Sequence, residues 1–516
     1  MYTKRQKKEE KKAQKQIEEK TNIANINSAK KNGEPKVIEL NLSATVAVII
    51  AIIVLIVTVT SVKVITTIIV ADENKKLNND TQISNERVTY VNSTLKDESG
   101  NIVNETDADG NVIQVPVPKG YSASQIEGET TASKGFVIYE GDVDWSTILV
   151  DSESTQSNVA IDEPAFEDDL IVINENMPES DNEQDANEDE NTADDATTND
   201  DTATDPTTPT QEEINIFNLQ KTRNQYVWVP VKDPSRIYGV DDKGKLWGKL
   251  YNFSDTGRTA LNWSETNGIM NITNKIGYRE PDVFKGTTDW YFSRYNLGVV
   301  ETKYEMLTKE LEQNYYKMIE SIKKYGGFYI GRYETGGLNG TAVVRKMDIN
   351  ISRNDWKENY KKCLTLRGKN TYVKTLMIFG NLWDETLEWL VKSGATISDG
   401  TVLTYQLIKN TEAFGNYYYT TFKYIAGNAN VPVLTEVKEP KVTTMIPTGS
   451  AEYSKINNIY DLAGNVWDVT IEAHSTGSRV FRGGSYNYDV PVFNRSDVVP
   501  GGDIPAHGCR SVLWIK

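Results

Sequence analysis

Cysteine and histidine are scarce in this chain of 516 residues. It contains two cysteines, Cys363 and Cys509, and two histidines, His474 and His507. Because zinc sites draw several ligands from these two residue types, a zinc site built from Cys and His is excluded, as is a three-histidine iron centre. Two cysteines form at most one disulfide, and the sequence leaves one bridge and two free thiols equally open.

Basic and aromatic residues are each missing from a long internal stretch. No Lys or Arg occurs from Gly135 through Gln220, and no aromatic residue occurs from Pro178 to Glu213. Such a composition cannot bury enough apolar surface to offset the entropy of the chain. We therefore expect residues 151–215 to form an acidic, disordered linker. A soluble spacer is the preferred interpretation, and a cation-binding arm is the alternative.

The net charge of −17 is spread unevenly, because lysine dominates residues 1–39. An uncharged, largely apolar run of 23 residues follows, from Leu40 to Val62. A helix of about 20 apolar residues crosses a bilayer. Lysine on its N-terminal side predicts a cytoplasmic N-terminus. We expect a basic cytoplasmic tail over 1–39, a single transmembrane anchor over 40–70 and an extracellular C-terminal region.

The apolar run has two alternative interpretations. A cleaved signal peptide fits poorly, because the tail before the run is long and no small-residue cleavage site follows it cleanly. A prepilin leader is the second alternative, since residues 33–40 loosely resemble one, but the glutamate lies one place too far from the glycine. The expected location is therefore the cell membrane, with one span.

The region beyond the anchor divides by composition. Residues 71–108 are polar and predict a stalk. Residues 109–150 predict a short β segment, because 111–118 and 135–141 are rich in β-branched residues and bordered by Gly or Pro. Nine of the ten tryptophans follow Asn224, so we place a large folded domain at 216–516.

Periodicity predicts an α+β domain with much irregular structure. Residues 225–231 alternate as a strand does, and residues 328–333 predict a second strand after Gly326-Gly327. A first amphipathic helix is expected where apolar residues recur three or four positions apart, at Val300, Tyr304, Leu307, Leu311, Tyr315, Met318 and Ile322. A second amphipathic helix is expected over 382–391.

Three groups of motifs in this domain resemble the formylglycine-generating-enzyme family, also called the sulfatase-modifying-factor domain. The first is Tyr226–Val231 with Gly327–Glu334, and the second is Trp383–Trp389. The third, Tyr460–Asp468 followed by Arg479–Tyr486, is the most specific and nearly spells the family's GNVWE and RGGSW segments. The resemblance covers about the last 290 residues and implies a C-type-lectin-like fold.

The same motifs have a structural interpretation of their own. Gly464-Asn465 suits a turn with positive φ, and Trp467 is a large apolar anchor. Gly483-Gly484 allows close backbone approach, while Arg479 and Arg482 can donate to backbone carbonyls. We prefer these structural roles to catalytic ones.

The family's chemistry is not retained at the matching positions. Its two copper-binding cysteines fall on Tyr488 and Phe493, and neither side chain is a thiolate ligand. Cys509 matches an aromatic position of the family and is expected to be a packed core thiol. We therefore expect a non-catalytic domain. An enzyme of the formylglycine-generating type, or another oxidoreductase on the same fold, is the alternative.

The resemblance also implies a calcium site around the GNVWE-like segment. Carried over residue by residue, its ligands are the side chains of Asp461 and Asp468 and the carbonyls of Gly464 and Val466. Mixed carboxylate and carbonyl oxygens suit Ca²⁺. Asp468 is shorter than the family's Glu, and the alternative is that Asp461 caps a turn while Asp468 faces solvent. No other cofactor is expected.

Five residue types are missing near the C-terminus. From Ala473 to Leu513 there is no Lys, Glu, Gln, Met or Trp, and these are types that codons ending in C or T cannot encode. Residues 485–508 also lack apolar periodicity. This resembles the variable region of diversity-generating-retroelement proteins, in which adenine-containing codons are randomised to vary a ligand surface. A loop that happens to lack these types is the alternative.

The predicted function is a surface-displayed receptor or adhesin that binds an extracellular protein or glycan. The membrane is expected as a partner through 40–70, and nucleic acid is not. A cell-wall spacer protein is a further alternative, although an aromatic-rich head would then be superfluous. Aromatic, amide and carboxylate side chains suit a contact surface, here expected to comprise Tyr486, Asn487, Tyr488, Asp489, Phe493, Asn494, Asp497, Asp503 and His507.

Overall fold

The computed structural model describes most of the chain beyond residue 86. The described residues are 87–150, 208–240, 246–261, 263–264, 269–272, 275–278, 300–337, 341–349, 356–475, 478–498 and 506–516. The expected cytoplasmic tail, the anchor over 40–70 and most of the acidic linker lie outside them. Within the described ranges, no helix combines the length and apolar character needed to cross a membrane.

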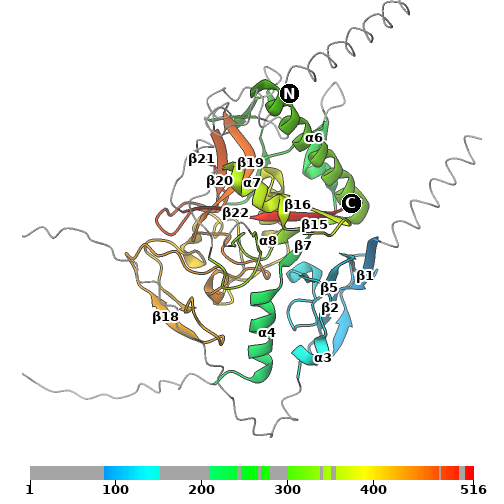
Figure 1. The fold of residues 1–516 in the computed structure, drawn as a ribbon, viewed down its shortest axis with the longest axis vertical. Coiled ribbons are helices and arrows are strands. Elements are labelled where there is room, and N and C mark those ends of the chain that lie inside the picture. The colour runs from blue at the N-terminus through cyan, green and yellow to red at the C-terminus, as the bar shows by residue number, and fades with distance from the viewer. Residues whose placement is uncertain are drawn as a thin grey trace, which may run out of the picture. The chain divides into compact units, whose positions relative to one another are not determined.

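A mixed α+β architecture is built around one six-stranded sheet (Figure 1). Neighbouring strands in this sheet are all antiparallel. The C-terminal strand lies inside the sheet, which explains why Val512 and Leu513 are fully buried. In spatial order the strands are β16 (Val373–Met377), β23 (Ser511–Ile515), β15 (Gly327–Gly331), β7 (Gln225–Pro230), β6 (Val137–Glu140) and β5 (Tyr121–Ala123).

The expected 109–150 segment contributes strands to this sheet. Strand β6 pairs with β7 across the acidic linker, with Val137 opposite Val227. A buried ion pair adds to the connection, because Arg332 Nη1 lies 2.6 Å from Glu129 Oε1. The β segment and the following domain therefore share one sheet and one core.

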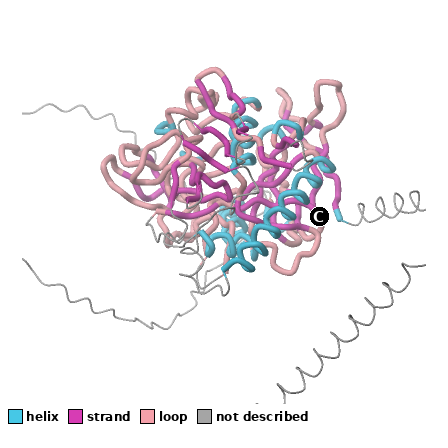
Figure 2. The backbone as a smooth tube through the Cα atoms, turned by 90° about the horizontal axis from the view of Figure 1, so that it is seen from above, coloured by secondary structure: helices cyan, strands magenta, loops and turns pink. Residues whose placement is uncertain are grey.

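A second, four-stranded sheet carries the C-terminal motifs. Its order is β21 (Ser496–Val498), β20 (Ser478–Arg482), β19 (Trp467–Ser475) and β22 (His507–Cys509). The β19–β22 pair is parallel, and the other two pairs are antiparallel. The expected irregularity is also present, since pink loops make up much of the domain in Figure 2.

Four longer helices surround the sheets. Helix α6 (Val300–Tyr325) confirms the first periodicity, because Leu311, Tyr315, Met318 and Ile322 are fully buried on one face. Helix α8 (Gly380–Lys392) confirms the second and is buried along most of its length. The remaining two are α4 (Gln211–Thr222), which begins with a capping box at Thr210, and α7 (Trp356–Thr365).

Short elements complete the described part. They are α3 (Trp145–Ile148), β1 (Val88–Asn92), β2 (Thr94–Lys96), β3 (Ile102–Asn104), β4 (Gln114–Pro118), β8 (Tyr238–Val240), β9 (Leu246–Gly248), β10 (Tyr251–Ser254), β11 (Gly257–Ala260), β12 (Trp263–Ser264), β13 (Ile269–Ile272), β14 (Lys275–Tyr278), β17 (Phe422–Ile425) and β18 (Leu434–Lys438). Four 3₁₀ turns lie at Ala132–Lys134, Pro234–Arg236, Thr411–Ala413 and Glu452–Ser454.

Candidate ligand-binding site

The candidate surface begins where β20 ends, at two glycines. Gly483 and Gly484 have φ of +87° and +80°, so both adopt the left-handed conformation that glycine tolerates best. A Cβ on Gly484 would lie 2.7 Å from the buried Tyr417 ring. The Tyr417 hydroxyl donates to the Gly483 carbonyl at 2.8 Å. The predicted close approach of the backbone at Gly483-Gly484 is therefore present. The turn that follows packs on the buried Tyr417.

The turn after the glycines presents three side chains to solvent. Backbone hydrogen bonds in both directions between Ser485 and Tyr488 close it. Tyr488 is 61% exposed, and Asn487 and Asp489 are exposed beside it. Tyr486 is half-buried. The expected outward orientation therefore holds most clearly for residues 487–489.

Beyond the turn, the chain becomes more closely packed. Phe493 is half-buried and stacks on Phe253, with the ring centroids 5.5 Å apart. Val492 is buried, and its carbonyl accepts a hydrogen bond from Trp383 Nε1 at 3.1 Å. Asn494 is half-buried. Phe493 and Asn494 therefore border the exposed turn and do not form its tip.

Two acidic members of the expected surface are only partly described. The backbone of Asp497 pairs with Val480 as part of β21. Its side chain, and all of Asp503, lie outside the described residues. Their expected contact roles therefore stay predictions.

The expectation that His507 contributes to the contact surface is wrong. His507 lies on β22, is 4% exposed and packs against Phe481, with the ring centroids 4.8 Å apart. Burial lowers the pKa of its imidazole to about 4. At neutral pH it is an uncharged core side chain beneath the second sheet's aromatic residues.

Sequence inspection missed the buried charged network below the surface. Arg482 Nη2 lies 2.9 Å from Asp384 and 3.0 Å from Glu472, while Arg495 lies 2.5 and 2.7 Å from the same two carboxylates. All four side chains are at most 5% exposed. Two guanidinium groups thus neutralise two carboxylates and join α8, β19 and β20 to the chain before β21.

Arg482 only partly matches its expected structural role. Its Nη1 donates to the Phe493 carbonyl at 3.0 Å, as expected, but its other end binds carboxylates. The signal that could have revealed the network was the acidic face of the motif at 383–389. There Asp384, Glu385 and Glu388 all face arginines.

A pair of carboxyl groups lies beside the exposed turn. Asp489 hydrogen-bonds the side chain of Glu412, on the 3₁₀ turn at Thr411–Ala413. Partial burial, the hydrogen bond to Glu412 and the negative charge of Glu412 raise the pKa of Asp489 to about 6. On the same 3₁₀ turn, the Thr411 hydroxyl donates to the Val490 carbonyl at 3.1 Å. The segment around 411–419 is therefore a second border of the candidate surface, and sequence inspection did not identify it.

The predicted calcium ligands lie in the interior, where hydrogen-bond donors already surround most of them. The Asp461 carboxylate accepts bonds from Thr448, the Gly449 amide and Ser454 at 2.6–2.8 Å. Asp468 is also buried, so neither the turn cap with a solvent-facing aspartate nor an open site describes the pair. The positive φ predicted for Gly464 is present, at +74°.

Arg510 lies between the predicted metal ligands. It donates to Asp468 Oδ2 and to the Asp461 carbonyl, each at 3.0 Å. Its positive charge opposes a cation at this place, while Asp468 Oδ1 is buried and has no hydrogen-bond partner among the described residues. Val466 contributes its amide, which donates to Glu334 at 3.2 Å. Calcium there stays a prediction that depends on the free Asp468 oxygen.

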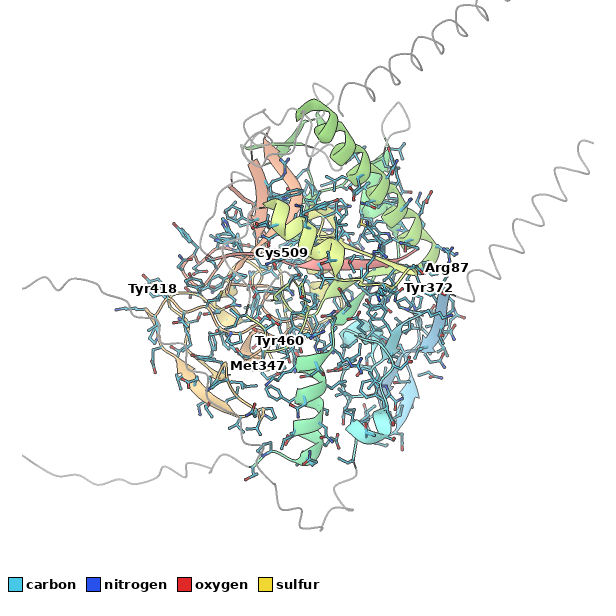
Figure 3. All side chains as sticks on the ribbon, viewed as in Figure 1. Arg87, Met347, Tyr372, Tyr418, Tyr460 and Cys509 are labelled. Atoms are coloured by element: carbon cyan, nitrogen blue, oxygen red, sulfur yellow. The ribbon has the colours of Figure 1, made fainter. Side chains whose placement is uncertain are left out.

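The two cysteines are adjacent in the interior. Cys363 on α7 and Cys509 on β22 are both free and buried, and their Sγ atoms lie 3.5 Å apart. Figure 3 labels Cys509 beside α7. Burial raises the pKa of the Cys363 thiol well above its ordinary value. The expected core position of Cys509 is confirmed.

Comparison with known proteins gives little further information. No protein-family model matches the chain, and no curated protein matches it. Among solved structures it is similar to Treponema denticola variable protein 1, with a TM-score of 0.23 and 16% identity over 36% of this chain and 84% of that one. It is also similar to the structure described as CarF, with a TM-score of 0.19 and 12% identity over 37% and 87%. Both scores are too low to support an argument, and the formylglycine-generating-enzyme resemblance is not confirmed.

Proposed function

We propose that this protein is a surface-displayed, non-catalytic ligand-binding protein whose contact surface is centred on Asn487, Tyr488 and Asp489. The observation that carries the proposal is the contrast between these exposed side chains and their support. The backbone beneath them is fixed by Tyr417 and by Ser485, both fully buried. Binding residues are often carried on loops that a rigid scaffold positions.

The chemistry of the turn supports a contact role. A tyrosine supplies a large rigid surface at low entropic cost, and an adjacent amide and carboxylate supply adaptable hydrogen bonds. Because the ion pairs of Arg482 and Arg495 are buried, they hold the scaffold and do not compete for ligand. The ligand class proposed is an extracellular protein or a glycan.

We propose that residues 216–516 form a C-type-lectin-like domain of the sulfatase-modifying-factor type. This domain is displayed at the cell membrane through the anchor over 40–70. Diversification of the region after Ser485 fits this arrangement, because the exposed residues 487–489 can change without disturbing the buried contacts of Val492 and Arg495.

The alternative is an oxidoreductase of the formylglycine-generating type. Such an enzyme needs reactive thiols, and the thiols of this chain are both buried. Because the thiolate is the reactive form, the raised pKa of Cys363 opposes this function. Tyr488 and Phe493 stand at the family's copper-binding positions.

A glycan array, together with a screen of purified extracellular proteins, tests the proposed function. The detergent-purified full chain should bind at least one probe, and replacement of Asn487, Tyr488 and Asp489 by Ala should abolish that binding. The matched control replaces exposed Tyr90, Asn92 and Asp109 by Ala and should leave binding unchanged. Binding that survives the first triple variant contradicts the proposed surface.

Sequencing the gene in many cells of one population tests diversification separately. Substitutions should concentrate at adenine-containing codons between 486 and 507, next to an unmutated template repeat. A uniform sequence without a template repeat contradicts diversification and leaves the binding proposal standing.

A further inference from the structure

A cavity of about 480 Å³ lies between the C-terminal half of α6 and the end of β23, and its lining includes none of the residues of the candidate surface. Four lysines line it: Lys317 and Lys324 from α6, Lys374 from β16 and Lys516 at the chain's end. Among the described residues, Glu320 is the only acidic side chain that lines it. The cavity therefore carries an excess of positive charge.

The four lysine ammonium groups form no ion pair with a carboxylate among the described residues. Lys324 instead lies over the Tyr325 ring, 5.0 Å from its centroid. The main-chain oxygen of Lys516 is already held by Arg87 Nη1 at 2.5 Å. The acidic side chains near these lysines, Glu320 in the lining and Glu310 close to Lys374, are fewer than the lysines, so the cavity keeps a net positive charge that an anion can balance.

Hydrogen-bond donors without partners line the same cavity. Ser321 Oγ and Tyr325 OH are buried and have no partner among the described residues, and each side chain belongs to a residue only 6% exposed. Buried polar groups are nearly always hydrogen-bonded, so each such group calls for an explanation. An oxyanion accepts from hydroxyl groups and is attracted by ammonium groups at the same time.

The lysines also affect one another's protonation. Burial lowers the pKa of Lys374 and of Lys516, and the charges of Arg367 and Lys317 lower both further. Glu310 opposes this at Lys374. A bound anion would relieve the repulsion that these like charges exert on one another.

We propose that this cavity binds a phosphate group, carried either by a small free phosphate or by a lipid headgroup. Several lysines suit a group that carries up to two negative charges, and the two hydroxyl groups on one face of α6 suit its oxygens. Buried Trp514 and Ile515 supply an apolar wall beside them. This site is separate from the proposed ligand surface, so either proposal can fail without the other.

The position of the cavity along the chain makes a lipid source reasonable to test. Tyr325 and Ile515 pack with Val88, near the start of the described chain. Residue 87 follows the last residue of the predicted anchor by 17 positions, so a lipid headgroup is tested as a source beside a free phosphate.

Thermal unfolding of the full chain in a neutral detergent tests the proposal. Three conditions are compared at equal ionic strength: inorganic phosphate, short-chain phosphatidylglycerol and sodium chloride. A ligand that binds only the folded state raises the melting temperature. We expect the melting temperature to be higher in phosphate or in phosphatidylglycerol than in sodium chloride.

Variants locate the effect. Lys374→Gln with Lys516→Gln should remove the shift, and Ser321→Ala should weaken binding by about tenfold, the effect of losing one charge-assisted hydrogen bond. Lys361→Gln with Lys423→Gln, at exposed lysines elsewhere, is the matched control and should retain the shift. Each variant is compared with its own melt in chloride, so a change in basal stability does not affect the result.

The outcomes separate the two sources. A shift with inorganic phosphate identifies a free oxyanion site, and a shift with phosphatidylglycerol alone identifies a headgroup site; both support the proposal. No shift with either ligand overturns it. A shift that persists in the Lys374 and Lys516 double variant overturns it as well.

Discussion

Individual residues within one short stretch have opposite roles. Tyr488 is 61% exposed, whereas Arg495, seven positions later, is buried between Asp384 and Glu472. The sequence places both in a segment without periodicity and gives no reason to separate them. A variable-looking stretch can therefore contain a residue on which the domain's stability depends.

Urea denaturation should separate these two residues. Tyr488→Ala should change the free energy of unfolding by no more than about 0.5 kcal/mol, as exposed substitutions usually do. Arg495→Ala should cost about 3–5 kcal/mol, because it leaves buried carboxylates with one guanidinium in place of two. Equal losses for the two variants would contradict the assignment of surface and scaffold.

The carboxyl pair predicts a dependence of stability on pH. The folded-state pKa of Asp489 is raised from 3.8 to about 6, by partial burial and by Glu412. Its contribution to stability is therefore complete below about pH 4 and is lost as the pH rises through 6. Asp489→Asn should flatten the fall in melting temperature between pH 4 and 7.

Asp399→Asn is the matched control for this titration. Asp399 is exposed, and its hydrogen bonds to Thr401 hold the pKa of its carboxyl below the ordinary value. Its titration therefore lies below the window in which Asp489 changes charge. An Asp489→Asn melting curve that keeps the slope of the unmodified chain argues against the raised pKa of Asp489.

At the scale of elements, the cysteines connect a helix to a strand. Because Cys363 on α7 and Cys509 on β22 are 3.5 Å apart, we expect oxidative refolding of the full chain to join them in a disulfide. The bridge closes a long loop and should raise the melting temperature. Peptide mass mapping without reductant detects it.

Cys363→Ser provides the control for the disulfide, since it removes the bridge with little change in volume. Its melting temperature should not respond to reductant, whereas that of the oxidised parent should fall. If both thiols remain alkylatable after refolding under an oxidising glutathione mixture, the two elements do not come close enough to be joined.

The calcium prediction depends on Asp468, which lies on strand β19. If Asp468 Oδ1 coordinates calcium, added calcium should raise the melting temperature and a chelator should lower it. Asp468→Asn should remove the difference between the two conditions. Melting that is indifferent to both calcium and chelator contradicts a calcium site at Asp468.

At the scale of the whole molecule, topology is a prediction from the N-terminal sequence. From the lysine-rich tail and the uncharged run, we predict that residues 64–516 lie outside the membrane. Protease added to intact cells should remove the head, and a variant lacking 43–62 should be protected inside. A C-terminus that is digested only after the cells are permeabilised reverses the predicted orientation.

Periodic patterns were sufficient to predict the helices and strands in which they are strong. The apolar spacing of α6 and of α8, and the alternation of β7, reflect burial on one face or in a sheet, which leaves a local periodic signal. The positive φ at Gly464 was predicted from local sterics in the same way, and so was the close backbone approach at Gly483-Gly484. Local chemistry was sufficient in each case.

The fold, and not any local pattern, shows which distant residues meet. Arg495 pairs with Asp384, 111 residues away, and with Glu472, 23 residues away, while Arg332 pairs with Glu129 on the other side of the acidic linker. His507 looked like an exposed loop residue because no periodicity marks a three-residue strand, yet β22 carries it into the core. Long-range contacts leave no pattern within one segment, because the free energy that fixes them is shared between segments.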